Sequence, residues 1–304
     1  TASILMIVSS TVSLLLAARL LNGIAIGLLS GPVVAAMVEL HPQSSHALAS
    51  RMSSILTTVS AALGLFAATI IVDLLQDGWL GLVAPFAMQF ATLACAFVLV
   101  FAFPETLPAT SRRRWMAVDY RPSAVAIPRE IALDFTFAAG AAFVAWAVVG
   151  FWLALAPTLV NLSLGPGYMA HGGIAAAVVL AVAGAIQLPA KHTEDFVALV
   201  AGLAIAVLSL GALQVFPIGP SLPLLYLAAA AGGVGQGLCW MGSAGLVNRV
   251  CPPSGRAGAI SALFIAVYAG VFAILAVGVV ADYFGMTAGV TTFVTATVLL
   301  AVLT

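Results

Sequence analysis

Three polar side chains recur on one face of a predicted helix in the C-terminal third of the chain. Gln236, Trp240 and Ser243 are spaced i, i+4 and i+7, which places them on a single helix face. An amide, an indole and a hydroxyl can hydrogen-bond an uncharged organic molecule and offer it an aromatic wall. This spacing therefore predicts a binding face for an amphipathic organic ligand. Further candidates for the same cavity lie within other apolar runs: Asn22, Trp146 and Tyr268.

The remaining reactive residue types form no cluster that predicts covalent or metal chemistry. The four histidines lie in predicted loops or at helix ends, and none pairs with an acidic residue in a metal-ligand pattern. The three cysteines have no paired spacing. No phosphate-binding GxxxxGK[ST] loop occurs, so we expect no ATP use. We therefore predict a protein that is not an enzyme and holds no metal or cofactor, with a membrane-embedded enzyme as the remote alternative.

The composition indicates which solvent surrounds these residues. The chain has 304 residues, of which 63% are hydrophobic and 7% are charged, and its mean hydropathy is +1.20. Soluble domains carry roughly a quarter charged residues, and a chain of this length could not bury so much apolar surface. Lipid must therefore cover most of it. The formal net charge is zero, which gives no reason to expect a nucleic-acid partner.

Ten apolar runs are long enough to predict membrane-spanning helices, since about 20 residues cross a bilayer. A tight turn near Arg19 is expected to separate the first two runs, because one helix through both would be about twice the membrane thickness. Trp152 and Asn161 of the fifth run are interpreted either as further cavity residues or as interfacial residues at its outer end. The runs cover residues 2–17, 20–40, 52–73, 80–103, 133–160, 170–190, 196–216, 222–247, 258–281 and 286–304.

The positions of the basic residues predict the orientation in the membrane. Lys and Arg are enriched in cytoplasmic loops. With ten helices, every basic residue except Arg19 falls on one side of the membrane. We therefore predict a multi-pass protein of the inner or plasma membrane with a cytoplasmic C-terminus. The long loop 104–132 is cytoplasmic as well, and it separates an N-terminal half, 1–103, from a six-helix C-terminal half, 133–304.

Glycines on predicted helix faces indicate close helix packing and an internal repeat. Gly23, Gly27 and Gly31 recur every four residues, a spacing that lets two helices approach closely. Gly64 and Gly270 hold corresponding places in two segments that each run from a basic to an acidic residue. The two copies have the same predicted membrane orientation, as in transporters built from parallel halves. The first half then contains four of six helices, and two further helices are expected before Thr1.

Several motifs of the chain, in this order, resemble those of the major facilitator superfamily. Arg19 with Gly23 and Gly27 resembles the signature of the family's fourth helix. The stretch from Asp73 to Trp79 resembles the end of its fifth helix. Two further stretches, 103–108 and 255–285, resemble the end of the sixth helix and the eleventh helix. The resemblance covers essentially the whole chain, as family helices three to twelve.

This resemblance implies a secondary active transporter of a small organic solute that works by alternating access. One form of that function is efflux of a drug or metabolite by proton antiport, and the alternative is an importer or uniporter of a neutral metabolite or sugar-like solute. The resemblance also implies that Arg19 couples transport to a proton or to the substrate. A basic residue within a bilayer is costly and tends to be functional. The other interpretation of Arg19 is an anchor at the membrane interface.

Overall fold

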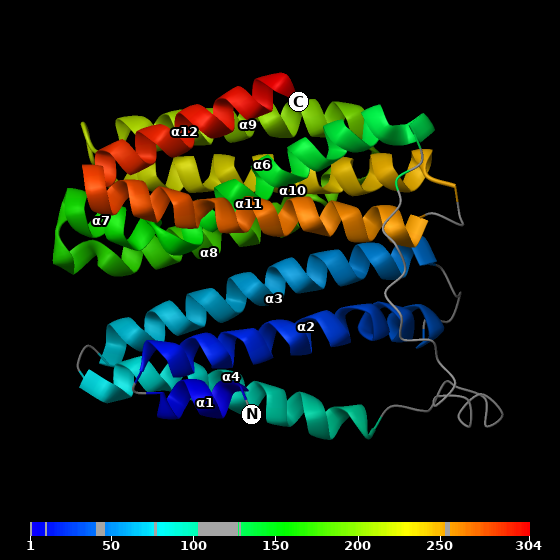
Figure 1. Cartoon of the computed structure of the whole chain (residues 1–304). Helices are drawn as coiled ribbons and strands as arrows, with labels where there is room; N and C mark the ends of the chain where they lie inside the picture. The colour runs from blue at the N-terminus through cyan, green and yellow to red at the C-terminus, as the bar shows by residue number, and fades with distance from the viewer. Residues whose placement is uncertain are drawn as a thin grey trace. The chain divides into compact units, whose positions relative to one another are not determined.

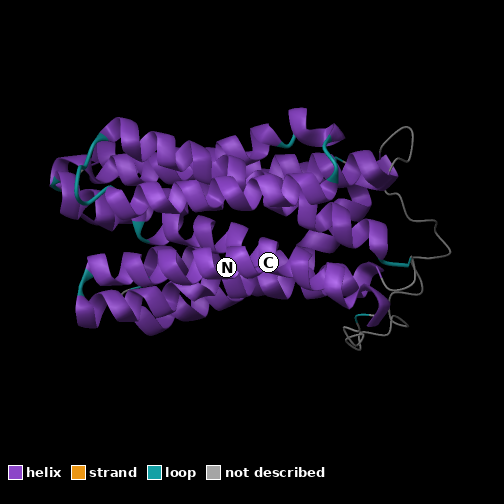
Figure 2. Cartoon of the chain, turned by 90° about the horizontal axis from the view of Figure 1, so that it is seen from above, coloured by secondary structure: helices purple, strands orange, loops and turns teal. Residues whose placement is uncertain are grey.

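The described residues of the computed structural model, 2–9, 11–40, 46–75, 78–102, 127, 129–252 and 256–304, are helical with short connections. None of them forms a strand (Figures 1 and 2). The longer helices are α2 (Val12–Leu40), α3 (His46–Leu75), α4 (Gly78–Val100), α6 (Ala132–Ala154), α8 (Met169–Ile186), α9 (Asp195–Val215), α10 (Leu222–Val250), α11 (Arg256–Phe284) and α12 (Met286–Leu303). The shorter helices are α1 (Ala2–Val8), α7 (Ala156–Leu164), η2 (Arg129–Ile131), η3 (Pro166–Tyr168) and η4 (Pro189–His192).

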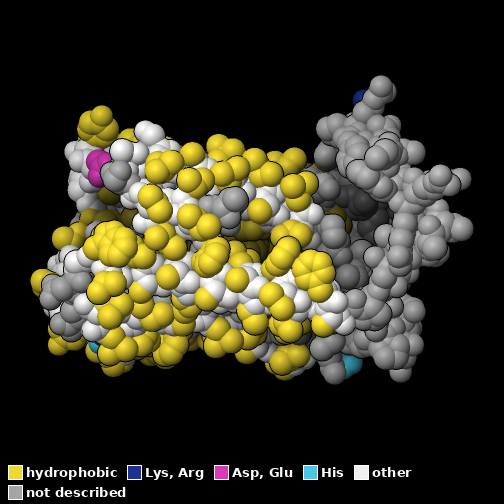
Figure 3. All heavy atoms as spheres, turned by 90° about the horizontal axis from the view of Figure 1, so that it is seen from below, with side chains coloured by type: hydrophobic (Ala, Val, Ile, Leu, Met, Phe, Trp, Pro, Cys, Tyr) yellow, Lys and Arg dark blue, Asp and Glu magenta, His cyan; other side chains and the backbone are white. Residues whose placement is uncertain are grey.

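Eight helices of the described part are long and apolar enough to cross a membrane. They are α3, α4, α6 and α8 to α12, and this set is typical of a multi-pass, all-helical membrane protein. On the face shown in Figure 3, hydrophobic side chains cover most of the described surface. Large apolar residues on several helices lie outward, such as Phe97, Leu208 and Phe272 at 66%, 69% and 62% exposed. These side chains are suited to contact with lipid.

The predicted turn near Arg19 was wrong. Helix α1 has seven residues, about 10 Å at 1.5 Å per residue, which is too short to cross a bilayer. Residues 12–40 form the single helix α2, and Arg19 lies exposed within it. The first break lies earlier, where Thr11 Oγ1 accepts a hydrogen bond from the Leu14 N–H (3.4 Å) and so caps the start of α2. Arginine is a good helix former, and its long side chain lets a helix continue past the charge.

The predicted helix 133–160 is divided in two. Helix α6 ends at Ala154 and α7 begins at Ala156, with Leu155 between them. Pro157 lies in the first turn of α7 and cannot donate to the carbonyl four residues earlier. The hydrogen bonds from Leu155 N to Phe151 O and from Leu159 N to Leu155 O are kept, both at 2.8 Å. The break is therefore a local kink rather than a loop.

The chain divides into two compact units. The first contains residues 1–56 and 67–121, and the second contains residues 57–66 and 122–304. The second unit includes α6 to α12 and holds most of the buried core. Most of the predicted cytoplasmic loop 104–132 lies outside the described residues.

Helix α10 lies at the centre of the second unit, because glycines let its neighbours approach closely. A Cβ atom placed on Gly235 would lie 2.7 Å from the backbone nitrogen of Ala206 on α9. A Cβ on Gly233 would lie 2.5 Å from the carbonyl oxygen of Val179 on α8. Real Cβ atoms do not occupy such positions. Close packing of α8 and α9 on α10 thus requires glycine at these points.

The glycines predicted to allow close packing differ in their surroundings. A Cβ on Gly270 of α11 would overlap the carbonyl oxygen of Phe143 on α6, so Gly270 permits a close helix contact. A Cβ on Gly23 or Gly64 would meet no atom within 4 Å, so close packing is not seen at these two positions. The surroundings of Gly27 and Gly31 in α2 lie outside the described part of the chain.

Two turns between the helices require glycine for a different reason. Gly165, after α7, has φ 101° and ψ 170°, and Gly285, between α11 and α12, has φ 88° and ψ 159°. This region of backbone space is essentially open to glycine alone. Each glycine ends one helix and starts the next within a single residue, which keeps α11 and α12 side by side.

Candidate functional site

One face of α10 carries two buried polar side chains whose oxygen atoms have no hydrogen-bond partner in the described part of the chain. We define the α10 polar face as Gln236, Trp240 and Ser243. Gln236 is 2% exposed and Ser243 is 0% exposed. Neither the Oε1 atom of Gln236 nor the Oγ atom of Ser243 has a hydrogen-bond partner among the described residues. Buried polar groups are nearly always hydrogen-bonded, so two orphaned atoms on one helix face are an unusual feature that needs a physical reason.

Aromatic side chains from three helices meet beside this face. The Trp146 ring of α6 meets the Trp240 ring of α10 edge to face, with centroids 6.1 Å apart. Trp240 also contacts Phe264 of α11 at 5.5 Å, and Phe264 contacts Tyr268 at 6.4 Å. We call these four residues the aromatic run. Its buried end carries a third orphaned atom, because the Trp146 Nε1–H has no partner in the described part of the chain.

The packing of α10 explains where its polar face points. Gly235 and Gly242 lie against α9, and Gly233 and Gly237 lie against α8. Gly232 is one turn before Gln236, and a Cβ on it would lie 2.9 Å from Ser209 Oγ of α9, 3.0 Å from Trp152 Nε1 and 3.5 Å from Val148 of α6. The polar face therefore lies toward α6, between the α8 and α9 contacts. Tight glycine packing on the two flanks fixes the rotation of the helix and so holds Gln236 and Ser243 in the interior.

The predicted candidates divide between the two units. Trp146, Gln236, Trp240, Ser243 and Tyr268 all lie in the second unit, and the aromatic contacts join three of them, Trp146, Trp240 and Tyr268. Asn22, which is half-buried, and the exposed Arg19 lie in the first unit. The site described here is therefore confined to the second unit.

Sequence reasoning missed Phe264, which bridges Trp240 and Tyr268. The available signal was its i, i+4 spacing to Tyr268 on one helix face. Of the two interpretations of Trp152, the interfacial one is wrong, because Trp152 is 0% exposed; its Nε1–H has no partner among the described residues.

Charged side chains of the second unit's described spans lie only near helix ends. Asp134 is in the first turn of α6, Asp195 is in the first turn of α9, and Asp282 is two residues from the end of α11. Arg249 is in the last turn of α10. The middle of these spans is therefore uncharged, and the α10 polar face offers hydrogen bonds without an ionic partner.

Polar contacts tie each end of α10 to a neighbouring helix. At its C-terminal end, Arg249 donates to the Asp195 carboxylate of α9 at 2.5 Å, with Glu194 at 3.9 Å. A Cβ on Gly245 would overlap that carboxylate, so glycine there admits the ion pair. At the N-terminal end, His171 Nδ1 of α8 and the Tyr226 hydroxyl share a hydrogen bond of 2.7 Å. His171, in the first turn of α8, is half-buried.

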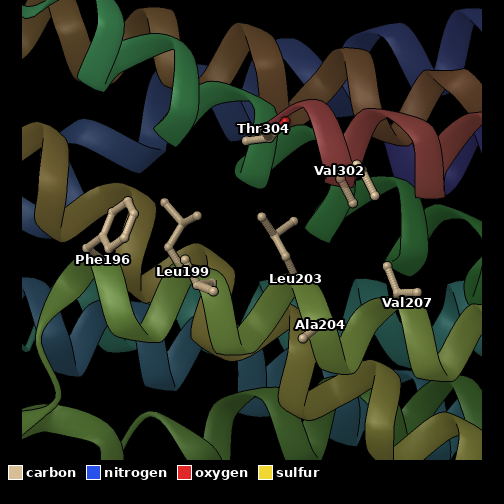
Figure 4. A pocket seen from close by; sticks show the side chains of 9 residues that line it. Phe196, Leu199, Leu203, Ala204, Val207, Val302 and Thr304 are labelled. Atoms are coloured by element: carbon tan, nitrogen blue, oxygen red, sulfur yellow. The ribbon is translucent and has the colours of Figure 1, made fainter.

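Two grooves on the second unit lie apart from the polar face. One, of about 460 Å³, runs between α9 and α12; Figure 4 shows Phe196, Leu199 and Leu203 of α9 below Val302 of α12. The other, of about 330 Å³, is lined by α6, α11 and α12. Their linings are almost wholly apolar and include none of the residues of the α10 polar face. The volume of a groove therefore does not identify the candidate site, which is assigned instead from the polar side chains of α10.

Comparison of the chain with models of protein families, with curated proteins and with solved structures found no match.

Proposed function

We propose that this protein is a secondary active transporter of a small organic solute that works by alternating access, with the α10 polar face and the aromatic run as part of its solute site. The observation that carries the proposal is the pair of orphaned atoms on Gln236 and Ser243, both in the interior of an apolar helix unit. A buried polar atom without a partner costs roughly 1–3 kcal/mol. A solute that hydrogen-bonds these atoms would offset that cost when it binds.

The surrounding contacts fit a unit whose helices move against one another. Glycine contacts on α10 let helices slide or tilt without side-chain collisions. Polar contacts lie near each end of α10, Asp195 with Arg249 and His171 with Tyr226. The Arg249 side chain is about half exposed, and an ion pair of this kind breaks and re-forms with little cost. In the proposed transporter these contacts open in turn, and the solute site faces each side of the membrane alternately.

We further propose that the protein has the architecture of the major facilitator superfamily, with two parallel halves, and that Arg19 couples transport to protons. These proposals come from the sequence motifs and from the uneven distribution of basic residues. They place the C-terminus and the loop 104–132 in the cytoplasm. Single cysteines introduced as Arg249→Cys and as Tyr283→Cys should then react with a membrane-impermeant thiol reagent from opposite sides of the membrane. Labelling of both from the same side would contradict this topology.

Transport by the full-length protein in liposomes tests the function. A pH-sensitive dye inside the vesicles is followed while aromatic heterocycles, lipophilic cations and polyols are added under a proton gradient. Substrate-dependent proton movement that disappears in Arg19→Ala supports antiport with Arg19 in the coupling step. Solute uptake without proton movement supports the importer or uniporter and makes Arg19 an anchor.

A matched pair of glutamine variants tests the site itself. Gln236→Leu should lower the rate of solute transport, because it removes an orphaned acceptor from the site. Gln187→Leu is the control, since Gln187 is also buried but its side-chain amide donates to Ala183 O of its own helix at 3.0 Å. Equal transport by both variants would contradict the assignment of the site to α10.

A further inference from the structure

Three of the orphaned atoms of the second unit, on Gln236, Trp146 and Ser243, belong to the α10 polar face and the aromatic run and define a hydrogen-bonding pattern there. Gln236 Oε1 can only accept, the Trp146 Nε1–H can only donate, and Ser243 Oγ can do either. A solute that satisfies them must therefore carry at least one N–H or O–H donor and one acceptor. A solute that lacks the donor leaves Gln236 Oε1 buried and unpaired, which weakens its binding.

The distribution of charge in the described part of the second unit argues against an ionic solute. The nearest charged positions along the chain that the structure describes are at helix ends, such as Arg249 in the last turn of α10 and Asp134 in the first turn of α6. Moving an ion out of water without a charged partner is far more costly than moving a neutral polar group. A lipophilic cation could be attracted to aromatic faces, but at a buried site it would gain no carboxylate from the described residues to offset its desolvation.

The aromatic run determines the shape that fits. Trp146 and Trp240 meet edge to face, so their rings lie at right angles with an interplanar angle of 90°. Phe264 and Tyr268 continue the run toward the outside and are 40% and 53% exposed. Offset stacking on such ring faces favours a flat, conjugated molecule. A polyol has no π system to stack and matches only the polar half of the site.

We infer that the solute is an uncharged, planar heteroaromatic molecule that carries a hydrogen-bond donor and an acceptor together. This inference rests on the proposed transport function, because it assigns the substrate class of the same site. The donor binds Gln236 Oε1, the acceptor receives the Trp146 N–H, and the flat ring stacks within the aromatic run. The Ser243 hydroxyl can donate or accept a further hydrogen bond.

A matched set of small molecules tests this substrate class. The probe is tritiated 2-quinolone, which is flat and neutral and has an N–H beside a carbonyl. The competitors are N-methyl-2-quinolone, which lacks only the donor, N-methylquinolinium, which is flat but cationic, and sorbitol, which is neutral but not aromatic. Binding is measured on the purified full-length protein, and transport is measured separately in liposomes with all four molecules.

The expected result is that 2-quinolone binds roughly tenfold more tightly than its N-methyl derivative. This is the difference in affinity expected when one buried hydrogen bond is lost. In Gln236→Leu the two should bind equally, whereas Gln187→Leu should keep the difference. The comparison of the two ligands on the unaltered protein does not depend on the folding of any variant. Equal binding of the two quinolones, or tighter binding of N-methylquinolinium, would overturn the inferred class.

The transport measurement separates this inference from the proposed function. Uptake of sorbitol or N-methylquinolinium that depends on Gln236, without preference for 2-quinolone, would leave a transporter and refute the heteroaromatic class. Failure of all four molecules to bind and to be transported would count against both the class and the site.

Discussion

Replacement of Gly235 by alanine tests the close approach of α9 and α10, which sets the position of the α10 polar face. The new Cβ would lie 2.7 Å from the Ala206 nitrogen and 2.9 Å from the Gly202 carbonyl oxygen. Both are backbone atoms of a helix, so no side chain can turn away to make room. Ordinary contact begins at 3.4 Å, so α9 would have to retreat by about 0.7 Å, the difference from 2.7 Å.

The expected cost follows from these distances. Overpacking of a tight interior costs roughly 1–3 kcal/mol. Alanine regains up to about 1 kcal/mol through its better helix propensity. With that full gain, Gly235→Ala should be destabilised by up to roughly 2 kcal/mol. Gly211→Ala is the matched control on α9, because a Cβ there meets nothing within 4 Å, and this variant should be as stable as the parent or more so.

A thiol-reactive dye can report the unfolding of both variants. Cys239 and Cys251 are buried, whereas Cys95 is exposed. In a Cys95→Ser background the dye gains access to the two remaining thiols only when the helices separate. We expect a lower Tm for Gly235→Ala and an equal or higher Tm for Gly211→Ala. A Gly235→Ala protein as stable as the Gly211→Ala protein would refute the close α9–α10 contact.

Three further predictions use the same assay. Ser209→Ala removes a buried hydrogen bond of 2.7 Å to Ala228 O and should cost about 0.6 kcal/mol of stability. Ser243→Ala removes a hydroxyl without a partner among the described residues and should not lower the Tm. A lower Tm for Ser243→Ala than for Ser209→Ala would contradict the assignment of partners. A double-mutant cycle of Asp195→Asn and Arg249→Gln should give a coupling energy of about 0.2–1 kcal/mol, because Arg249 is about half exposed. This coupling energy should decrease in high salt. A coupling energy that does not change with salt would argue against an exposed ion pair. Gly285→Ala should cost about 1–3 kcal/mol, since φ is 88° there, and an unchanged Tm would show that the turn has another conformation.

The apolar runs predicted the helices well, but two of their boundaries were wrong for identifiable reasons. Arg19 was taken as the mark of a turn, whereas the hydroxyl of Thr11 caps the helix start. The signal was present in the sequence, because threonine is a preferred N-cap residue. The kink before Pro157 was also predictable, since proline disrupts a helix at the preceding turn. Hydropathy alone does not register either effect.

Part of the site was predictable because helical periodicity is local. The spacing of Gln236, Trp240 and Ser243 places them on one face whatever the tertiary structure. The contact of Trp146 with Trp240 joins residues 94 positions apart, and no local pattern determines it. Whether Gln236 and Ser243 have partners depends on the whole set of neighbours, so the orphaned atoms could not be found from sequence.

The glycine-lined flanks of α10 have a consequence for how such a protein can change over evolutionary time. Positions 233, 235, 237 and 242 admit no side chain without displacing the backbone of α8 or α9. Three sequence positions between those flanks, 236, 240 and 243, carry glutamine, tryptophan and serine. Ligand preference can therefore diverge through a few replacements on that face while the scaffold stays the same. Mutational tolerance should therefore be lower at these glycines than at the three positions of the α10 polar face.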